Sequence, residues 1–322
     1  MEGGHVLMTG ATGFIGSHMA NRLLEEKLSL VAVAAKDSNY KNVEEMRSKG
    51  VILIKGSFYD RECMDRIFDD FPIRKVIHVA ALRGGGSGTD EEYYAINVRG
   101  TETLLELSQK HNVDKFLFVS SVGVTGTIPY VLPGTTSHKF NGDNAYHRSK
   151  VLAEQRVNEC ITEGLNAYII RPTITYGPGD TGFPRTLVEL VRKRMLFLPA
   201  YDVRIHLLDV AALADLVVKM VKIDVPQQRT FIAADESPVL LKDLVNQIYD
   251  HYYHRGYPSF LKLPSSAYKA LALCAQAAHN EKWLTRFLLI SRNWYYDISA
   301  TIQAFSFVPA RTSDSFVKNM CN

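Results

Sequence analysis

A phenol and an ammonium near the middle of the chain have the spacing needed to move a proton together. Tyr146 and Lys150 are four residues apart in segment 144–160, whose apolar residues recur at helical spacing, so both are predicted on one helix face. A free phenol has a pKa of about 10 and is a poor acid or base at neutral pH. A nearby ammonium favours the phenolate, so this pair predicts general acid–base chemistry.

Two hydroxyls follow the buried strand predicted at 115–120 and are candidates to join this pair. In open parallel sheets, groups that contact a ligand gather at the carboxyl ends of strands. Ser120 and Ser121 occupy such an end. Either hydroxyl could therefore contact a ligand, although both could simply terminate the strand.

The chain opens with an apolar strand, a glycine turn and a helix, in that order. Residues 5–9 are the strand, Gly10, Gly13 and Gly16 follow at intervals of three, and helical periodicity continues from residue 17. Gly10 permits a tight turn, Gly13 lets the backbone approach a pyrophosphate, and Gly16 lets the helix pack on the strand. The helix N-terminus then faces the anion. This order predicts a dinucleotide site, although glycine also marks ordinary turns.

Five ordered motifs resemble those of the extended short-chain dehydrogenase/reductase superfamily, which is of the NAD-dependent epimerase/dehydratase type. TGATGFIG at 9–16 matches its opening letter for letter, and VIHVAA at 76–81, NVRGT at 97–101, RPTITYGPGD at 171–180 and HLLDVA at 206–211 are similar to later segments. The resemblance implies that Ser121, with Ser120 in reserve, Tyr146 and Lys150 are catalytic. It implies cofactor contacts by Gly10, Thr12, Gly13, Phe14, Ile15, Gly16, Ala80, Ala81, Asn97, Tyr146, Lys150, Pro172 and Thr173, with Asn97 also supporting a proton-relay water.

The end of the second strand bears on the choice between NAD and NADP. An acidic residue there would hold the ribose hydroxyls of NAD, but Ala34 and Ala35 are followed by Lys36, whose charge favours the 2′-phosphate of NADP. We therefore predict NADP, with NAD as the alternative, since a one-residue shift would bring Asp37 to the ribose. Ser57 and Phe58 stand where the superfamily usually has an acidic residue against the adenine, which puts that contact in doubt.

The alternation of patterns predicts an α/β fold with a doubly wound parallel sheet of the Rossmann type. Expected strands are 5–9, 29–35, 51–54, 75–80, 115–120 and 167–171. The predicted dinucleotide-binding domain comprises 1–172 plus 204–234, and a smaller, mostly helical substrate lobe comprises 173–203 plus 235–322. Loop 123–144 is expected to border the substrate and loop 83–88 to act as a lid, unless both are ordinary solvent loops. Helices near 91–112 and 146–163 could form a homodimer.

Composition excludes several classes of protein. The 322 residues carry 37 Lys and Arg against 34 Asp and Glu, a net charge of +3 that leaves no overall signature for nucleic acid. The four cysteines are widely spaced, with no metal-binding pattern, and suggest reduced thiols of a cytoplasmic protein. A strand that begins by His5 leaves no room for a signal peptide, and no apolar run is long enough to span a bilayer.

Three functions on a small-molecule substrate are compatible with this fold. A cofactor-binding regulator would need a broken Tyr-Lys pair, and dehydratases of the superfamily carry an Asp-Glu pair where this chain has Val122 and Gly123. Sugar epimerases usually place an Asn where Ile174 stands and an Arg where Asp202 stands. The apolar and aromatic run 261–299 looks like the 3β-hydroxysteroid dehydrogenase and dihydroflavonol reductase branch. The sequence thus predicts an NAD(P)-dependent oxidoreductase that interconverts a secondary alcohol and a ketone on a largely apolar substrate; the alternative is a nucleotide-sugar epimerase with tightly bound NAD.

Overall fold

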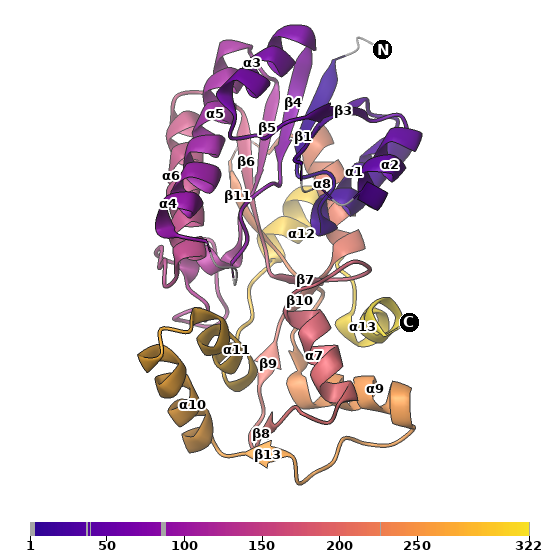
Figure 1. The fold of residues 1–322 in the computed structure, drawn as a ribbon, viewed down its shortest axis with the longest axis vertical. Coiled ribbons are helices and arrows are strands. Elements are labelled where there is room, and N and C mark those ends of the chain that lie inside the picture. Colours follow the sequence, from indigo (N-terminus) through magenta and orange to yellow (C-terminus); the bar gives the residue numbers. More distant parts are fainter. Residues whose placement is uncertain (1–3, 37, 39, 85–87, 226, 322) are drawn as a thin grey trace.

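A seven-stranded sheet forms the centre of the upper half of the molecule (Figure 1). In this computed structural model, residues 4–36, 38, 40–84, 88–225 and 227–321 are described. The strand order is β11-β6-β5-β4-β1-β2-β3, and each neighbouring pair is parallel. The bounds are β1 His5–Thr9, β2 Leu30–Ala34, β3 Ile52–Lys55, β4 Ile73–His78, β5 Lys115–Val119, β6 Ala167–Pro172 and β11 Thr230–Ala233. The predicted α/β doubly wound sheet is confirmed, and β11 adds a seventh strand to the six expected.

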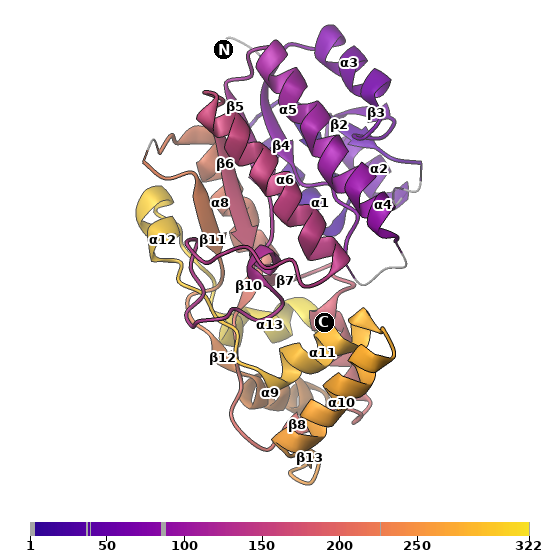
Figure 2. The ribbon, with the colours of Figure 1, turned by 90° about the vertical axis from the view of Figure 1, so that its left-hand side faces the viewer.

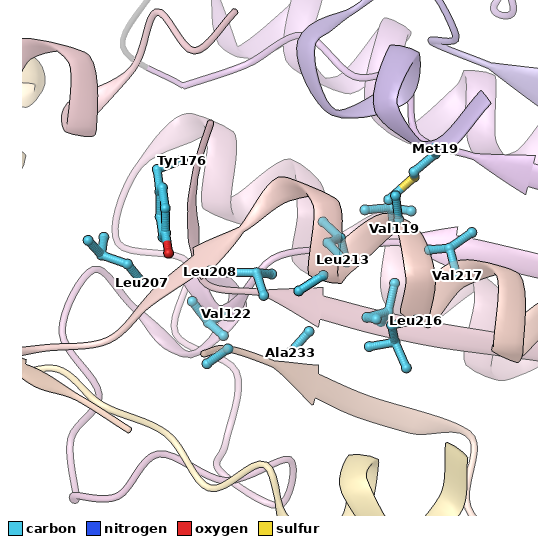
Figure 3. Packing of buried hydrophobic residues seen from close by; sticks show 14 of the residues in the cluster. Met19, Val119, Val122, Tyr176, Leu207, Leu208, Leu213, Leu216, Val217 and Ala233 are labelled. Carbon is cyan, nitrogen blue, oxygen red and sulfur yellow. The ribbon is translucent and has the colours of Figure 1, made fainter. Parts of the chain in front are cut away.

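Helices cover both faces of this sheet, as its alternating side chains require. In β5, Leu117 and Val119 face one core, which includes residues from α1 (Phe14–Glu25), α2 (Tyr40–Ser48) and α8 (Val210–Lys222). Phe116 and Phe118 face the other, which includes residues from α3 (Arg61–Asp70), α5 (Gly100–Lys110) and α6 (Ala145–Thr162). Figure 3 shows the first core, where Met19 of α1 and Leu213 and Val217 of α8 gather around Val119.

The chain beyond β6 builds a second group of elements past the carboxyl ends of the strands, which we call the lower lobe (Figures 1 and 2). It contains α7 (Phe183–Arg192), α9 (Leu241–Tyr253), α10 (Ser265–Ala277) and α11 (Glu281–Ser291), together with the paired short strands β8 (Leu198–Pro199) and β13 (Lys262–Leu263). The remaining elements are α4 (Asp90–Tyr93), η1 (Tyr94–Arg99), η2 (Val122–Thr125), β7 (Ile174–Tyr176), β9 (Arg204–Ile205), β10 (Leu207–Asp209), β12 (Val239–Leu240), α12 (Ser299–Phe305) and α13 (Thr312–Met320).

Among the described residues, no helix is both long and apolar enough to cross a membrane.

The apolar run near the C-terminus is buried less than a core would require. Tyr268 of α10 is buried, but Leu273 is 65% exposed and Trp283 of α11 is 45% exposed. α10 and α11 therefore pack mainly on each other and leave apolar side chains at the surface.

Candidate functional site

The glycine turn between β1 and α1 has the close approaches that the sequence predicted. Gly10 has a φ of +76°, and a Cβ built on it would lie 2.8 Å from the backbone nitrogen of Ala80. A Cβ on Gly16 would lie 1.9 Å from the carbonyl oxygen of Gly10, so only glycine lets α1 pack on the turn. Gly13 is the N-cap of α1, and no side chain caps the helix there. Phe14 and Ile15 begin the helix, whose first backbone N–H groups suit an anion.

A second motif segment lies against this turn. Nε2 of His18 in α1 is 2.9 Å from the carbonyl oxygen of Pro178, and the ring of Phe14 is 3.7 Å from a Cβ built on Gly179. Residues 177–180 follow β7, so the fold brings two glycine-containing segments, more than 160 residues apart in sequence, to one place. On the other side, Thr12 donates a 3.1 Å hydrogen bond to Ser38. The turn is thus held between the loops that follow β2 and β7.

The start of α6 packs against the turn that follows β5, and this contact gathers the predicted catalytic residues. Asn144 caps α6 by accepting a 2.8 Å hydrogen bond from the backbone N–H of His147. The ring of His147 covers Gly123, where a Cβ would lie 2.2 Å from Nε2. Lys150 is buried and donates a 2.8 Å hydrogen bond to the carbonyl oxygen of Val119, the last residue of β5. Tyr146 stands one helical turn before Lys150, on the same face.

The two serines at this strand end have different roles. Ser120 is buried and donates a 2.7 Å hydrogen bond to Glu154 of α6. Glu154 in turn forms a buried ion pair with Arg171 of β6. Ser121 is half-buried and accepts a 3.0 Å hydrogen bond from the N–H of Gly123, so its hydroxyl proton is not used by that bond. This difference favours Ser121 over Ser120 as the group that contacts substrate.

The electrostatics of the Tyr146–Lys150 pair differ from what the sequence predicted. Burial raises the pKa of Tyr146 to about 12, and the positive charge of Arg83 opposes this only in part. Burial lowers the pKa of Lys150 to about 7, while the charge of Glu154 pulls it upward. Lys150 is directed at Val119 and lies over the ring of Phe118, 4.4 Å from its centre. Desolvation therefore outweighs the mutual stabilisation that we expected.

The amide of Asn97 is hydrogen-bonded within the protein. Its Oδ1 accepts a 2.7 Å hydrogen bond from the N–H of Leu82, and its Nδ2 donates to the carbonyl of Leu82 and to Ser149. The residue is buried and belongs to η1, a π-helical segment. Its amide thus ties the loop after β4 to α6, and this use of the side chain leaves little capacity for the proton-relay water that we expected.

Several other predicted cofactor residues follow the carboxyl ends of the strands. The backbone N–H of Ala80 donates a 3.2 Å hydrogen bond to Thr9, beside Gly10, and Ala81 follows it. Ser57 is half-buried after β3, whereas the ring of Phe58 packs on His78 at 5.1 Å and is nearly enclosed. An adenine would therefore meet Ser57 and backbone here, with Phe58 as a support. Lys36 follows β2 and is exposed; Asp37 lies outside the described residues.

Pro172 and Thr173, which were predicted to contact the cofactor, offer a side-chain hydroxyl but no free backbone N–H. The N–H of Thr173 donates a 2.9 Å hydrogen bond to the carbonyl of Ala233, and Pro172, the last residue of β6, has no N–H. Oγ1 of Thr173 is buried, and within the described part of the chain it has no hydrogen-bond partner. A buried hydroxyl without a partner is costly unless a ligand supplies one. This orphaned atom fits a bound nicotinamide cofactor.

Sequence reasoning missed two groups beside Tyr146. Arg83 donates a 3.1 Å hydrogen bond to Thr181, which bridges the loop after β4 to the loop after β7. Nδ1 of His147 lies 2.5 Å from Oδ1 of Asp143. Burial acts to raise the pKa of the Asp143 carboxyl, but hydrogen bonds from His147 and from the backbone of Thr127 outweigh it, so the pKa is lowered. The spacing of Asp143 and His147 around a helix start was a signal that could have found this pair.

A cleft of about 530 Å³ lies between this pair and the lower lobe. One wall is formed by the chain just before Tyr146, and the other by α10 and α11. Its lining combines apolar side chains with charged ones: Thr127, Asp143, Asn144, Lys269, Ala272, Leu273, Gln276, Glu281, Leu284, Thr285, Leu288 and Arg292. A mixed cleft beside the candidate proton-transfer group is a suitable place for a substrate.

The fold, the glycine turn and the ordered motifs define a dinucleotide-dependent class of protein. The chain belongs to the NAD dependent epimerase/dehydratase family, whose model matches residues 6–231. It is similar to UDP-glucose 4-epimerase of Erwinia amylovora, with 35% identity over 163 residues that cover 47% of this chain and 46% of the relative. It is also similar to UDP-glucose 4-epimerase of Homo sapiens, with 30% identity over 209 residues that cover 58% of this chain and 60% of the relative. The chain thus spans about half to three fifths of the curated relatives it matches.

Solved structures extend the likeness in fold to the whole chain. WbmH of Bordetella bronchiseptica, solved with NAD+, has a TM-score of 0.78 at 19% identity and covers 99% of this chain and 97% of its own. UDP-glucose 4-epimerase of Thermotoga maritima, solved with UDP-glucose, has a TM-score of 0.77 at 19% identity and covers 98% and 97%. The predicted superfamily and an NAD-dependent enzyme of its extended type are confirmed, but the 3β-hydroxysteroid dehydrogenase branch is not. The relatives favour the epimerase alternative over our main expectation.

Proposed function

We propose that this chain oxidises a secondary alcohol of a nucleotide-bound sugar with NAD and then reduces the ketone in the same site, so that the net reaction is epimerisation. The observation that carries the chemistry is the packing of the first turn of α6 on the end of β5, with Lys150 bonded to Val119 and His147 seated on Gly123. This packing supports a shared site for Tyr146 and Ser121 at the end of β5. The names of the similar curated proteins support the substrate class.

Each catalytic residue has a distinct task in this proposal. When bound, NAD supplies the hydride acceptor. Tyr146 takes the proton from the substrate hydroxyl, and Ser121 donates a hydrogen bond to the same oxygen. Lys150 holds the ribose, and its ammonium offsets the charge of the phenolate. In the return step Tyr146 gives the proton back, so no proton is gained or lost over the cycle.

The residues that would hold the cofactor are those already described at the carboxyl ends of the strands. Gly10, Gly13 and Gly16 admit the pyrophosphate at the start of α1, and Thr173 supplies its unpartnered hydroxyl. We also retain the proposal that 1–172 plus 204–234 bind the cofactor and that 173–203 plus 235–322 bind the substrate. The preference for NADP that Lys36 suggested stays a prediction, because the similar solved structures were obtained with NAD.

A second candidate function is net oxidation or reduction of a largely apolar alcohol or ketone. The observation that favours it is the wall of the cleft formed by α10 and α11, which presents Leu273, Leu284 and Leu288. The half-buried Ile174 begins β7 at the position where sugar epimerases of the superfamily usually carry an Asn. An apolar side chain there offers no hydrogen bond to a diphosphate.

Cofactor retention separates the two candidates. The purified chain is denatured and the released nucleotides are quantified by mass spectrometry, after which UDP-glucose is added to fresh enzyme and followed by proton NMR. Near-stoichiometric NAD and formation of the 4-epimer are expected. A chain that is isolated empty, binds NADPH more tightly than NADH and leaves UDP-sugars unchanged would contradict epimerisation and favour the second candidate. Lys36→Glu should then abolish the NADPH preference.

A further inference from the structure

The far end of the lower lobe concentrates positive charge. Segments 190–201 and 251–280 together contain six Lys and Arg residues and no Asp or Glu, although the whole chain carries only +3. The remainder of the chain is therefore net acidic. The six cations are all exposed: Arg192, Lys193, Arg194, Arg255, Lys262 and Lys269. Arg192 forms an ion pair with Glu189, which neutralises its charge in part. The other five side chains therefore supply most of the positive charge at this end of the lobe.

The two segments form one surface because they are bonded to each other. β8 pairs with β13, and the N–H of Leu198 donates a 2.9 Å hydrogen bond to the carbonyl of Leu261. The hydroxyl of Tyr257 donates a 2.5 Å hydrogen bond to the carbonyl of Leu196. Both strands lie at the lower end of the molecule in Figure 1. We call this surface, formed by 192–199 and 255–263 with Lys269, the basic tip.

Large apolar side chains project from the basic tip. Along residues 195–198 burial alternates, with Leu196 and Leu198 in the core and Met195 and Phe197 outward at 61% and 44% exposed. This period of two is that of an extended chain with one solvated face. Phe260, which directly precedes the bonded Leu261, is 81% exposed. Two phenylalanines and a methionine thus stand in water on the surface that carries the cations.

We propose that the basic tip docks this enzyme on an anionic lipid surface. Exposed aromatic and aliphatic side chains insert at the boundary between headgroups and acyl chains, while surrounding Lys and Arg are attracted by anionic headgroups. The apolar residues distinguish this surface from a nucleic-acid site, where cations alone carry most of the affinity. The interaction is peripheral, and it does not rest on the proposed reaction. Docking would place the adjacent cleft, which Lys269 also lines, near the bilayer surface.

The test is flotation of the full chain with vesicles of phosphatidylcholine alone and of phosphatidylcholine with 30 mol% phosphatidylserine. Binding is expected only with phosphatidylserine and should weaken in 0.5 M salt. Lys193→Glu with Lys262→Glu should lower the partition coefficient by about 25-fold or more, because each cation near an anionic surface contributes about fivefold. Phe197→Ser with Phe260→Ser should lower it by about 100-fold, roughly tenfold for each ring.

Matched controls use exposed residues away from the basic tip. Lys27→Glu with Lys110→Glu makes the same change in net charge, and Ile302→Ser with Val308→Ser removes apolar side chains that are 40% and 76% exposed. Both controls should bind as the unaltered chain does, and all variants should keep its melting temperature. The proposal is overturned if the unaltered chain ignores phosphatidylserine vesicles, or if the controls lose binding as strongly as the tip variants. It is equally overturned if the tip variants instead abolish self-association or binding to a DNA duplex.

Discussion

Replacing Lys150 by Met should make the folded chain more stable at pH 7 while it abolishes turnover. Lys150 is 2% exposed, and burial lowers its pKa from 10.5 to about 7. Since one pKa unit corresponds to about 1.4 kcal/mol, keeping this amine in the folded chain at pH 7 costs about 4 kcal/mol relative to the unfolded chain. Met fills a similar volume without the charge. Loss of the hydrogen bond to Val119 destabilises the variant by about 1 to 1.5 kcal/mol. The net gain in the free energy of unfolding is therefore about 3 kcal/mol.

The pH dependence of this gain has a definite sign. Between pH 7 and 10.5 the unfolded chain holds the Lys150 proton more fully than the folded chain does, so this residue makes the stability of the unaltered chain rise with pH. The cost of Lys150 falls to about 1 kcal/mol near pH 9.5, where the lost hydrogen bond nearly cancels it. The advantage of Lys150→Met should therefore vanish at that pH.

Urea unfolding of both chains at pH 7 and at pH 9.5 measures these free energies directly. Lys110→Met, at an exposed position, is the control and should change stability by less than about 0.5 kcal/mol at either pH. The reasoning is refuted if Lys150→Met is less stable than the unaltered chain at pH 7. It is also refuted if the difference between the two chains is the same at both pH values.

Three further changes test the site and its support. Tyr146→Phe should keep NAD binding, measured by calorimetry, but lower turnover by several orders of magnitude because the proton-transfer group is gone; near-normal turnover would exclude its role. Gly16→Ala should destabilise the chain by about 3 kcal/mol or more, measured by thermal unfolding, since its Cβ would strike the Gly10 carbonyl, whereas Gly256→Ala, with 4.0 Å of clearance, should be nearly neutral. Glu154→Gln should cost about 3 kcal/mol in urea unfolding because it leaves Arg171 buried and unpaired, while Asp114→Asn, which breaks an exposed pair, should cost at most about 1 kcal/mol. Equal costs for these two carboxylates would contradict the importance of burial.

The parts of the site that local sequence determines were predicted well. Strand, turn and helix around Gly10 are set by residues within one short segment, and the six expected strands were each found within two residues of their predicted ends. The spacing of Tyr146 and Lys150 placed them on one helix because a helix repeats locally. The choice of Ser121 over Ser120 came from the resemblance, and the bond between Ser120 and Glu154 now gives it a physical reason.

The parts that depend on contacts between distant segments could not be predicted. Nothing local shows that Lys150 will bond to Val119, or that the amide of Asn97 will be used by Leu82 and Ser149. The proximity of Arg83 to Tyr146 likewise depends on how the loop after β4 crosses the site. The apolar character of α10 and α11 suggested a core or a ligand site, and only the three-dimensional packing shows how much of it faces water.

Tyr146, Lys150 and Glu154 occur at every fourth residue and so form a single row along α6. The first faces the candidate site, the second is bonded to β5, and the third is paired with Arg171 of β6, which also donates to the carbonyl of Thr136 in loop 123–144. Sliding α6 along its axis would separate all of these partners together. These contacts hold α6 in place, whereas α10 and α11, on the opposite side of the cleft, pack mainly on each other. Substitutions in α10 and α11 can then change which substrate is bound, while Tyr146, Lys150 and Glu154 of α6 stay unchanged.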